Sequence, residues 1–103
     1  MINFIKLIYN CLEKGVTDLH LTGGHPLVLR QNGNISFHKN IIWKPEDIDS
    51  LANSLLNQHQ KEILRHRWSV DFARTICKTR LRINIFSTTR GLSLAVRFLP
   101  GRI

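Results

Sequence analysis

Three arginines in the last quarter of the chain have the type and spacing that could bind phosphate groups. Arg82 and Arg97 lie in two segments of alternating apolar and polar residues, and Arg90 lies between those segments. Because successive side chains of a strand point to opposite faces, we expect Arg82 and Arg97 on the outer face of a sheet. Their guanidinium groups stay charged and offer forked donors that match phosphate oxygens. From the residues alone, a solvated sheet face on which positive charge discourages aggregation is the favoured interpretation.

Other pairs of residues are weaker candidates for a site. Asp18 and His20 are two residues apart on an expected strand, so their side chains share a face and could form an acid–base pair. We expect structural roles instead, with Asp18 anchoring a turn and His20 making a hydrogen bond, because no nucleophile or second carboxylate can be identified with them. Trp43 and Trp68 flank a helical region and are expected to close the ends of the core.

The cysteines and histidines match no metal or redox motif. Cys11 and Cys77 are far apart in the sequence, and we expect both to be buried, reduced thiols. The five histidines lack thiols or carboxylates at ligand spacing, so no metal site is expected.

The elements that must position the arginines follow from periodicity and turn chemistry. Apolar residues at helical spacing (Ile5, Ile8, Tyr9 and Leu12) predict a helix over residues 2–14, ended by Gly15. A second helix is expected to begin at Pro45 and to carry an apolar stripe from Ile48 to Leu56, although Lys44 is a poor N-terminal cap. A third helix is expected over residues 58–67. The expected strands are residues 18–22, 27–30, 35–38, 69–76, 79–86 and 92–99, with Asn32-Gly33 as a hairpin turn.

This order of elements predicts an α+β fold. One helix, three strands, further helices and three more strands suit an antiparallel sheet of about six strands with helices packed on one side, PAS-like in outline. The 103 residues fit a single domain. The formal charge of +8 suits partners such as phosphates, nucleic acid, anionic lipid or an acidic protein face. Since no apolar stretch approaches the roughly 20 residues of a spanning helix, we expect a cytoplasmic protein.

Several short motifs occur in an order that resembles the PilT-like type II/IV secretion ATPases. They are Asp18-Leu-His-Leu21, a small-residue turn with Pro26, a Leu-Arg pair before a hairpin ending in Gly33, Val70-Asp-Phe72, Arg82-Ile-Asn-Ile-Phe86, Arg90-Gly91 and Arg97-Phe-Leu-Pro100. Each motif is moderately specific, and their shared order over nearly the whole chain carries the resemblance.

The resemblance implies that residues 1–103 form an N-terminal regulatory and assembly domain of a hexameric traffic ATPase. Such a domain packs against RecA-like ATPase domains of its own and neighbouring subunits. Arg82 and Arg97, with Arg90 as a weaker candidate, would then approach bound nucleotide. The intact protein would use ATP and magnesium, form a homo-hexamer, and work at the inner-membrane platform of a pilus or secretion system, and nucleic acid is not an expected partner.

The chain also departs from the family pattern. It contains no G-x-x-x-x-G-K-[ST], so we do not expect this chain to hydrolyse ATP by itself. It stops at Arg102-Ile103, where the linker to the RecA-like domain would begin, which suggests a truncated or natural fragment. Thr88 and Thr89 stand where the family usually has a Gln or another polar residue, and Lys44 stands where a Thr or Ser cap is usual. Two other functions stay open: a stand-alone basic nucleic-acid-binding module, which ranks second, and a PAS-like small-molecule sensor.

Overall fold

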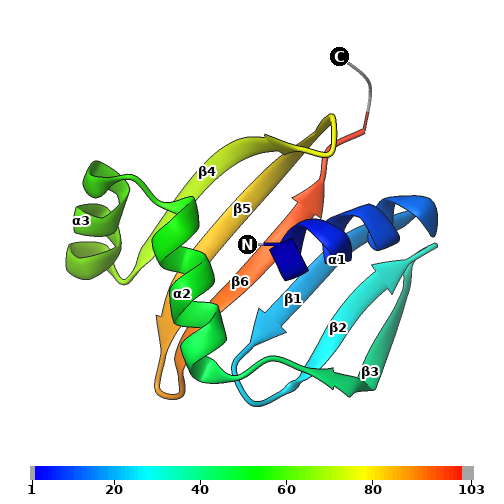
Figure 1. Ribbon diagram of the computed structural model, residues 1–103, viewed down its shortest axis with the longest axis horizontal. Coiled ribbons are helices and arrows are strands. Elements are labelled where there is room, and N and C mark those ends of the chain that lie inside the picture. Colours follow the sequence, from blue (N-terminus) through cyan, green and yellow to red (C-terminus); the bar gives the residue numbers. More distant parts are fainter. Residues whose placement is uncertain (1, 101–103) are drawn as a thin grey trace.

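A computed structural model describes residues 2–100, which form an open six-stranded antiparallel sheet and three helices (Figure 1). The predicted α+β class and the antiparallel sheet are therefore confirmed. The elements are α1 (Ile2–Glu13), β1 (Val16–Thr22), β2 (Pro26–Gln31), β3 (Asn34–Ile42), α2 (Pro45–Leu55), α3 (Gln58–Arg67), β4 (Ser69–Ile76), β5 (Thr79–Thr88) and β6 (Gly91–Phe98).

The first and last strands of the chain pair in the middle of the sheet. The strand order is β3-β2-β1-β6-β5-β4, so a meander of the first three strands joins a meander of the last three along the β1–β6 pair. In that pair Asp18 lies opposite Arg97 and Leu19 lies opposite Val96. The sheet is open, and β3 and β4, the first and last in this order, form its two edges.

Helices α1 and α2 lie across one face of the sheet, and the core fills the space between these layers (Figure 1). The predicted alternation is confirmed in β1 and β5, and β2 and β6 likewise turn every second residue into the core. No residue of the edge strand β3 is buried. The fully buried large residues are Phe4, Ile8, Leu19, Leu21, Leu27, Ile48, Leu81, Ile83, Ile85, Leu94 and Val96. The predicted stripe of α2 is confirmed, since Ile48, Leu51, Ala52, Leu55 and Leu56 are all buried.

The stripe predicted for α1 is partly wrong. Ile8 is buried as expected, but Ile5 is 41% exposed and Tyr9 is 55% exposed. The helix instead turns Phe4, Ile8 and Cys11 into the core. These residues also have helical spacing, but the face they form is rotated about the helix axis by roughly one residue relative to the predicted one. Because this short helix has apolar residues on both sides, periodicity alone does not show which side faces the core.

Two hairpins use left-handed backbone at both turn residues. Asn32 and Gly33 have φ of 53° and 78°, which confirms the predicted hairpin. The turn between β4 and β5 places Cys77 and Lys78 in the same region, with φ of 55° and 60°. The prediction that Cys77 is a buried thiol is wrong, because a turn residue at the end of the sheet is only partly covered.

The predictions for the helix ends and tryptophans have mixed outcomes. Lys44 makes no side-chain capping bond, as expected, whereas Asn57 and Gln60 form a complete capping box at the start of α3. Trp43 packs edge-on against Phe4 with ring centroids 6.5 Å apart, so it does help to close the core. Trp68 does not, because its side chain is 69% exposed.

Candidate functional site

The face of the sheet turned away from α1 and α2, here called the open face, carries the arginines singled out from the sequence. Strand register brings residues that are far apart in the chain into one row across it. The row runs through Arg30 of β2, Asp18 of β1, Arg97 of β6 and Arg82 of β5. Three guanidinium groups and one carboxylate therefore stand side by side on neighbouring strands.

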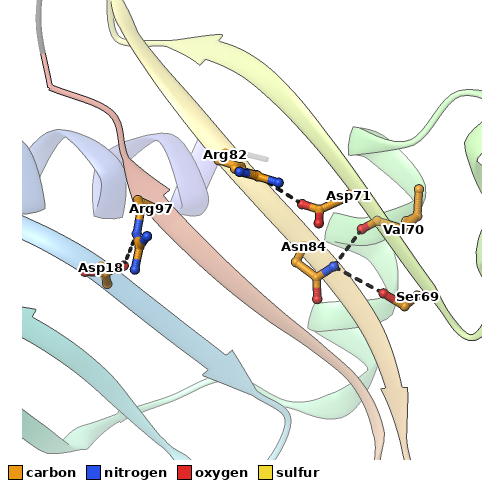
Figure 2. A network of polar contacts seen from close by, with 7 residues as sticks. All are labelled: Asp18, Ser69, Val70, Asp71, Arg82, Asn84 and Arg97. Carbon is orange, nitrogen blue, oxygen red and sulfur yellow. Dashed lines mark hydrogen bonds and ion pairs between the residues drawn. The ribbon is translucent and has the colours of Figure 1, made fainter.

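Arg97 is held by Asp18 on the next strand (Figure 2). Its Nε donates a hydrogen bond to Asp18 Oδ1 at 2.9 Å, while the arginine side chain remains 69% exposed and that of Asp18 is only 16% exposed. Asp18 was predicted to anchor a turn, and this is wrong, because the residue lies within β1 and its partner is across the sheet.

The environment of Asp18 keeps it charged. Partial burial acts to raise the pKa of its carboxyl group, but hydrogen bonds from Arg97 and Thr17 and the charges of Arg97 and Arg30 outweigh burial, so the pKa is lowered. Asp18 is thus an ionised carboxylate that orients one arginine and reduces the repulsion between two.

Arg82 lies directly opposite Arg97 in the strand register and leans the other way (Figure 2). Its Nε is 3.6 Å from Asp71 Oδ1 on β4, and both side chains are more than half exposed. Two like charges at opposed positions destabilise a sheet, and pairing each arginine with a carboxylate on its outer side relieves that repulsion. The two arginines flank a shallow hollow of about 270 Å³ on the open face.

Asn84 completes the polar network on β5. Its amide Nδ2 donates to Ser69 Oγ at 3.2 Å and to the Val70 carbonyl at 3.3 Å, which fixes the side chain against β4 (Figure 2). Asn84 also lines the hollow between the arginines, together with Asp71. The site therefore combines an amide side chain that hydrogen bonds hold in place with two guanidinium groups whose exposed side chains can change conformation.

This arrangement is suited to binding an anion. Exposed ion pairs contribute about 0–1 kcal/mol, so a phosphate could replace the exposed Asp71 carboxylate as the partner of Arg82 at little cost. The forked donors of two neighbouring guanidinium groups can then meet several oxygens of one ligand.

Arg90 is not brought to the Arg82–Arg97 pair. Arg90 lies in the turn after β5, which ends at Thr88, six residues or about 20 Å along the strand from Arg82. Its guanidinium group contacts the His25 imidazole instead. Arg90 and His25 line a different hollow of about 480 Å³, in which Phe37 and Phe86 supply aromatic surface.

Sequence reasoning missed three members of the open face. Arg30 and Asp71 were placed on strands but were not linked to the arginine cluster, and Phe37, which is 66% exposed, was overlooked. Alternation within each strand could have put all three on an outer face. Their neighbours depend on strand order, which alternation does not reveal.

The remaining reactive groups offer little chemistry in the part of the chain that is described. Burial raises the pKa of the Cys11 thiol to about 11, against a smaller opposing effect of the Lys14 charge, so this cysteine is a protonated core residue. Within residues 2–100, no three His, Cys, Asp or Glu side chains are grouped closely enough to hold a metal ion. None of the helices in this range has the length and apolar character needed to cross a membrane.

Comparison with known proteins bears on the fold of the chain. No protein-family model matches the chain. The chain is 29% identical over 100 residues to the protein YggR of Escherichia coli and 23% identical over 99 residues to the type IV pilus retraction ATPase PilT of Pseudomonas aeruginosa. These matches cover 96% and 95% of this chain but only 30% and 29% of those proteins, so the chain spans less than a third of their length.

Solved structures give the same result. A crystal structure of the pilus retraction motor PilT with bound ADP superposes with a TM-score of 0.83 at 33% identity, covering 96% of this chain and 29% of that one. The Legionella pneumophila ATPase DotB superposes with a TM-score of 0.78 at 15% identity, with the same coverage, which supports the fold alone. In sequence and fold, the chain is similar to an N-terminal domain of PilT-like secretion ATPases.

Proposed function

We propose that this domain is a regulatory and assembly domain of a hexameric PilT-like traffic ATPase, and that its open face packs against a RecA-like ATPase domain. The observation that carries the proposal is the position of Arg82 and Arg97. They lie opposite each other on β5 and β6, on the sheet face that the domain's own α1 and α2 leave uncovered, and both are about two-thirds exposed.

In this proposal the two arginines act on nucleotide phosphates bound by the partner domain. The resemblance to a motor crystallised with ADP supports this assignment, because the arginines of this chain fit an anionic ligand and not an apolar one. ATP and magnesium would be held by the RecA-like domain, which supplies the hydrolytic chemistry. The residues of this chain would orient and neutralise the phosphates from one side.

The proposed mechanical role follows from the rigidity of the sheet. The two arginines stand on β5 and β6, which are paired in one sheet, so a phosphate that gains or loses contact with them would displace the domain as a body. Repeated around a hexamer, such displacements would convert hydrolysis into movement of a pilus or secretion machine at the inner membrane. Arg90 has a lesser role in this scheme, since it faces a different hollow.

The test of the proposed function begins with the coding sequence beyond codon 103. A G-x-x-x-x-G-K-[ST] motif after a short linker is expected there. The encoded polypeptide should form hexamers and hydrolyse ATP, and the same polypeptide lacking residues 1–103 should lose most of that activity. An unaffected rate in the shortened polypeptide would contradict the proposal.

A second function, single-stranded nucleic-acid binding, is favoured by one observation. Phe37 and Phe86 line a hollow on the open face together with His20, His25 and Arg90, and aromatic rings beside basic groups are typical of stacking sites. It predicts that short oligonucleotides bind the chain with an affinity that falls steeply as salt is added. Absence of binding at low ionic strength would eliminate this alternative.

A further inference from the structure

Trp68 is a large apolar residue in an unusual position. It ends α3 with left-handed backbone, at a φ of 66°, and its side chain is 69% exposed. Its N–H donates to the Leu64 carbonyl at 2.8 Å and its carbonyl accepts from Ser87 N–H at 2.9 Å, so its backbone is fixed on both sides. Glycine or asparagine is the usual residue for this conformation, and the fold does not bury the indole in return.

A hollow of about 690 Å³ lies beside Trp68, between α3 and the β5–β6 hairpin. We call it the Trp68 groove and define it by three apolar residues, Leu64, Trp68 and Leu92, and two basic residues, Lys61 and Arg65. It is larger than the hollow between Arg82 and Arg97 and is separate from it.

Helix α3 forms one wall of the groove and is only loosely covered by the fold. Among its ten residues none is fully buried, although Ile63 and Leu64 touch the core. The capping box of Asn57 and Gln60 stabilises the start of the helix locally, which compensates in part for the missing burial. Leu64 is therefore only partly covered by the fold and also lines the groove, beside the exposed polar residues of α3.

The charge around the groove selects the kind of partner. Helix α3 carries three residues of the Lys/Arg type and a single acid, Glu62, which pairs with Arg65. The whole chain has a formal charge of +8, which favours an acidic partner. An acidic ligand meets complementary charge at the rim and an apolar floor between the charges.

We propose that the Trp68 groove binds an acidic segment of another protein. A bulky apolar side chain of that segment would pack against Trp68, Leu64 and Leu92, and carboxylates on either side of it would pair with Lys61 and Arg65. This surface differs from the arginine pair, and the proposal does not depend on a role in nucleotide hydrolysis. It explains why an exposed tryptophan stands where the backbone favours glycine.

The experiment is a selection of peptides from a random phage-displayed library on the immobilised 103-residue chain. We expect enriched peptides that carry an aromatic or long aliphatic residue flanked by Asp or Glu. Their affinity, measured by fluorescence anisotropy on labelled synthetic peptides, should weaken several-fold when NaCl rises from 50 to about 300 mM, because paired charges are screened. No enrichment, or enriched peptides without acidic residues, would overturn the proposal.

Two variants locate the binding. Trp68→Gly removes the indole and retains the left-handed backbone, and it should weaken peptide binding at least tenfold. Tyr9→Ser is the matched control, because it removes an exposed aromatic residue from α1, outside the Trp68 groove, and it should leave binding unchanged. Circular dichroism checks that both variants are folded. Equal losses of peptide binding in the two variants, or unchanged binding in Trp68→Gly, would contradict a binding site at Trp68. The proposal would also be contradicted if single-stranded DNA bound far more tightly than the peptides and displaced them.

Discussion

The two faces of the sheet use the same strands for different purposes. On the helix-covered face, Leu81, Ile83 and Ile85 of β5 are fully buried. On the open face, their immediate neighbours Arg82 and Asn84 bind polar partners on β4 and border a hollow. Alternation therefore separates the residues of the core from those of the proposed site, and substitutions on the two faces should have different consequences.

The largest expected effect on stability is in the core. Ile83→Ala should lower the free energy of unfolding by about 2–5 kcal/mol, because it opens a cavity beside residues that cannot relax to fill it. Its neighbour Arg82→Ala should change that free energy by no more than about 1 kcal/mol, since an exposed ion pair contributes little. Urea unfolding followed by circular dichroism measures both, and similar losses in the two variants would break the distinction between the faces.

The Asp18–Arg97 pair should contribute an intermediate, pH-dependent amount. The pKa of Asp18 is lowered in the folded state, so its contribution is present above the unfolded pKa of about 3.9 and is lost as pH falls through the folded value. Asp18→Asn should therefore be less stable than the parent by about 1 kcal/mol at pH 7. The difference should shrink below pH 4.

Urea unfolding of the parent and Asp18→Asn at several pH values between 2 and 7 tests this sign. If the difference in unfolding free energy is constant with pH, or grows as the pH falls, then the charge of the Asp18 carboxylate does not stabilise the fold. The variant should also retain a native circular dichroism spectrum, because the pair lies on the open face.

The smallest expected effect on stability is at Trp68. Trp68→Gly should leave the midpoint of thermal unfolding unchanged or raise the free energy of unfolding by up to about 1 kcal/mol, because glycine adopts the left-handed conformation without steric cost. Differential scanning calorimetry measures the change. A large loss of stability would mean that the indole supports the fold, and the exposed side of α3 would then belong with the core.

The faces of the strands could be predicted from the sequence because a two-residue period is explicit in segments such as Arg80 to Phe86. The hairpin at Asn32-Gly33 was equally predictable, because those residues suit positive φ. Cys77 and Lys78 adopt the same conformation without any such signal, and Trp68 ends its helix where a glycine would be usual. In these places tertiary pairing overrides local preference.

The composition of the site was predictable only in part. Arg82 and Arg97 were singled out, and the structure does bring them together. Their partners were not foreseen, because Asp18 is 79 residues from Arg97 and meets it only through the β1–β6 pairing. Cross-strand neighbours of this kind depend on the order of strands in the sheet, and periodicity within a strand carries no information about that order.

The central claim is that the open face places Arg82 and Arg97 against nucleotide, and it is tested most directly by ATP hydrolysis in the intact polypeptide that contains this domain. Arg82→Glu should reduce the rate at least tenfold. Arg80→Glu, on the same strand and the same exposed face but outside the hollow between the arginines, should keep most of the parent rate. Parent-like hydrolysis in Arg82→Glu, or an equal loss in both variants, would contradict the assignment.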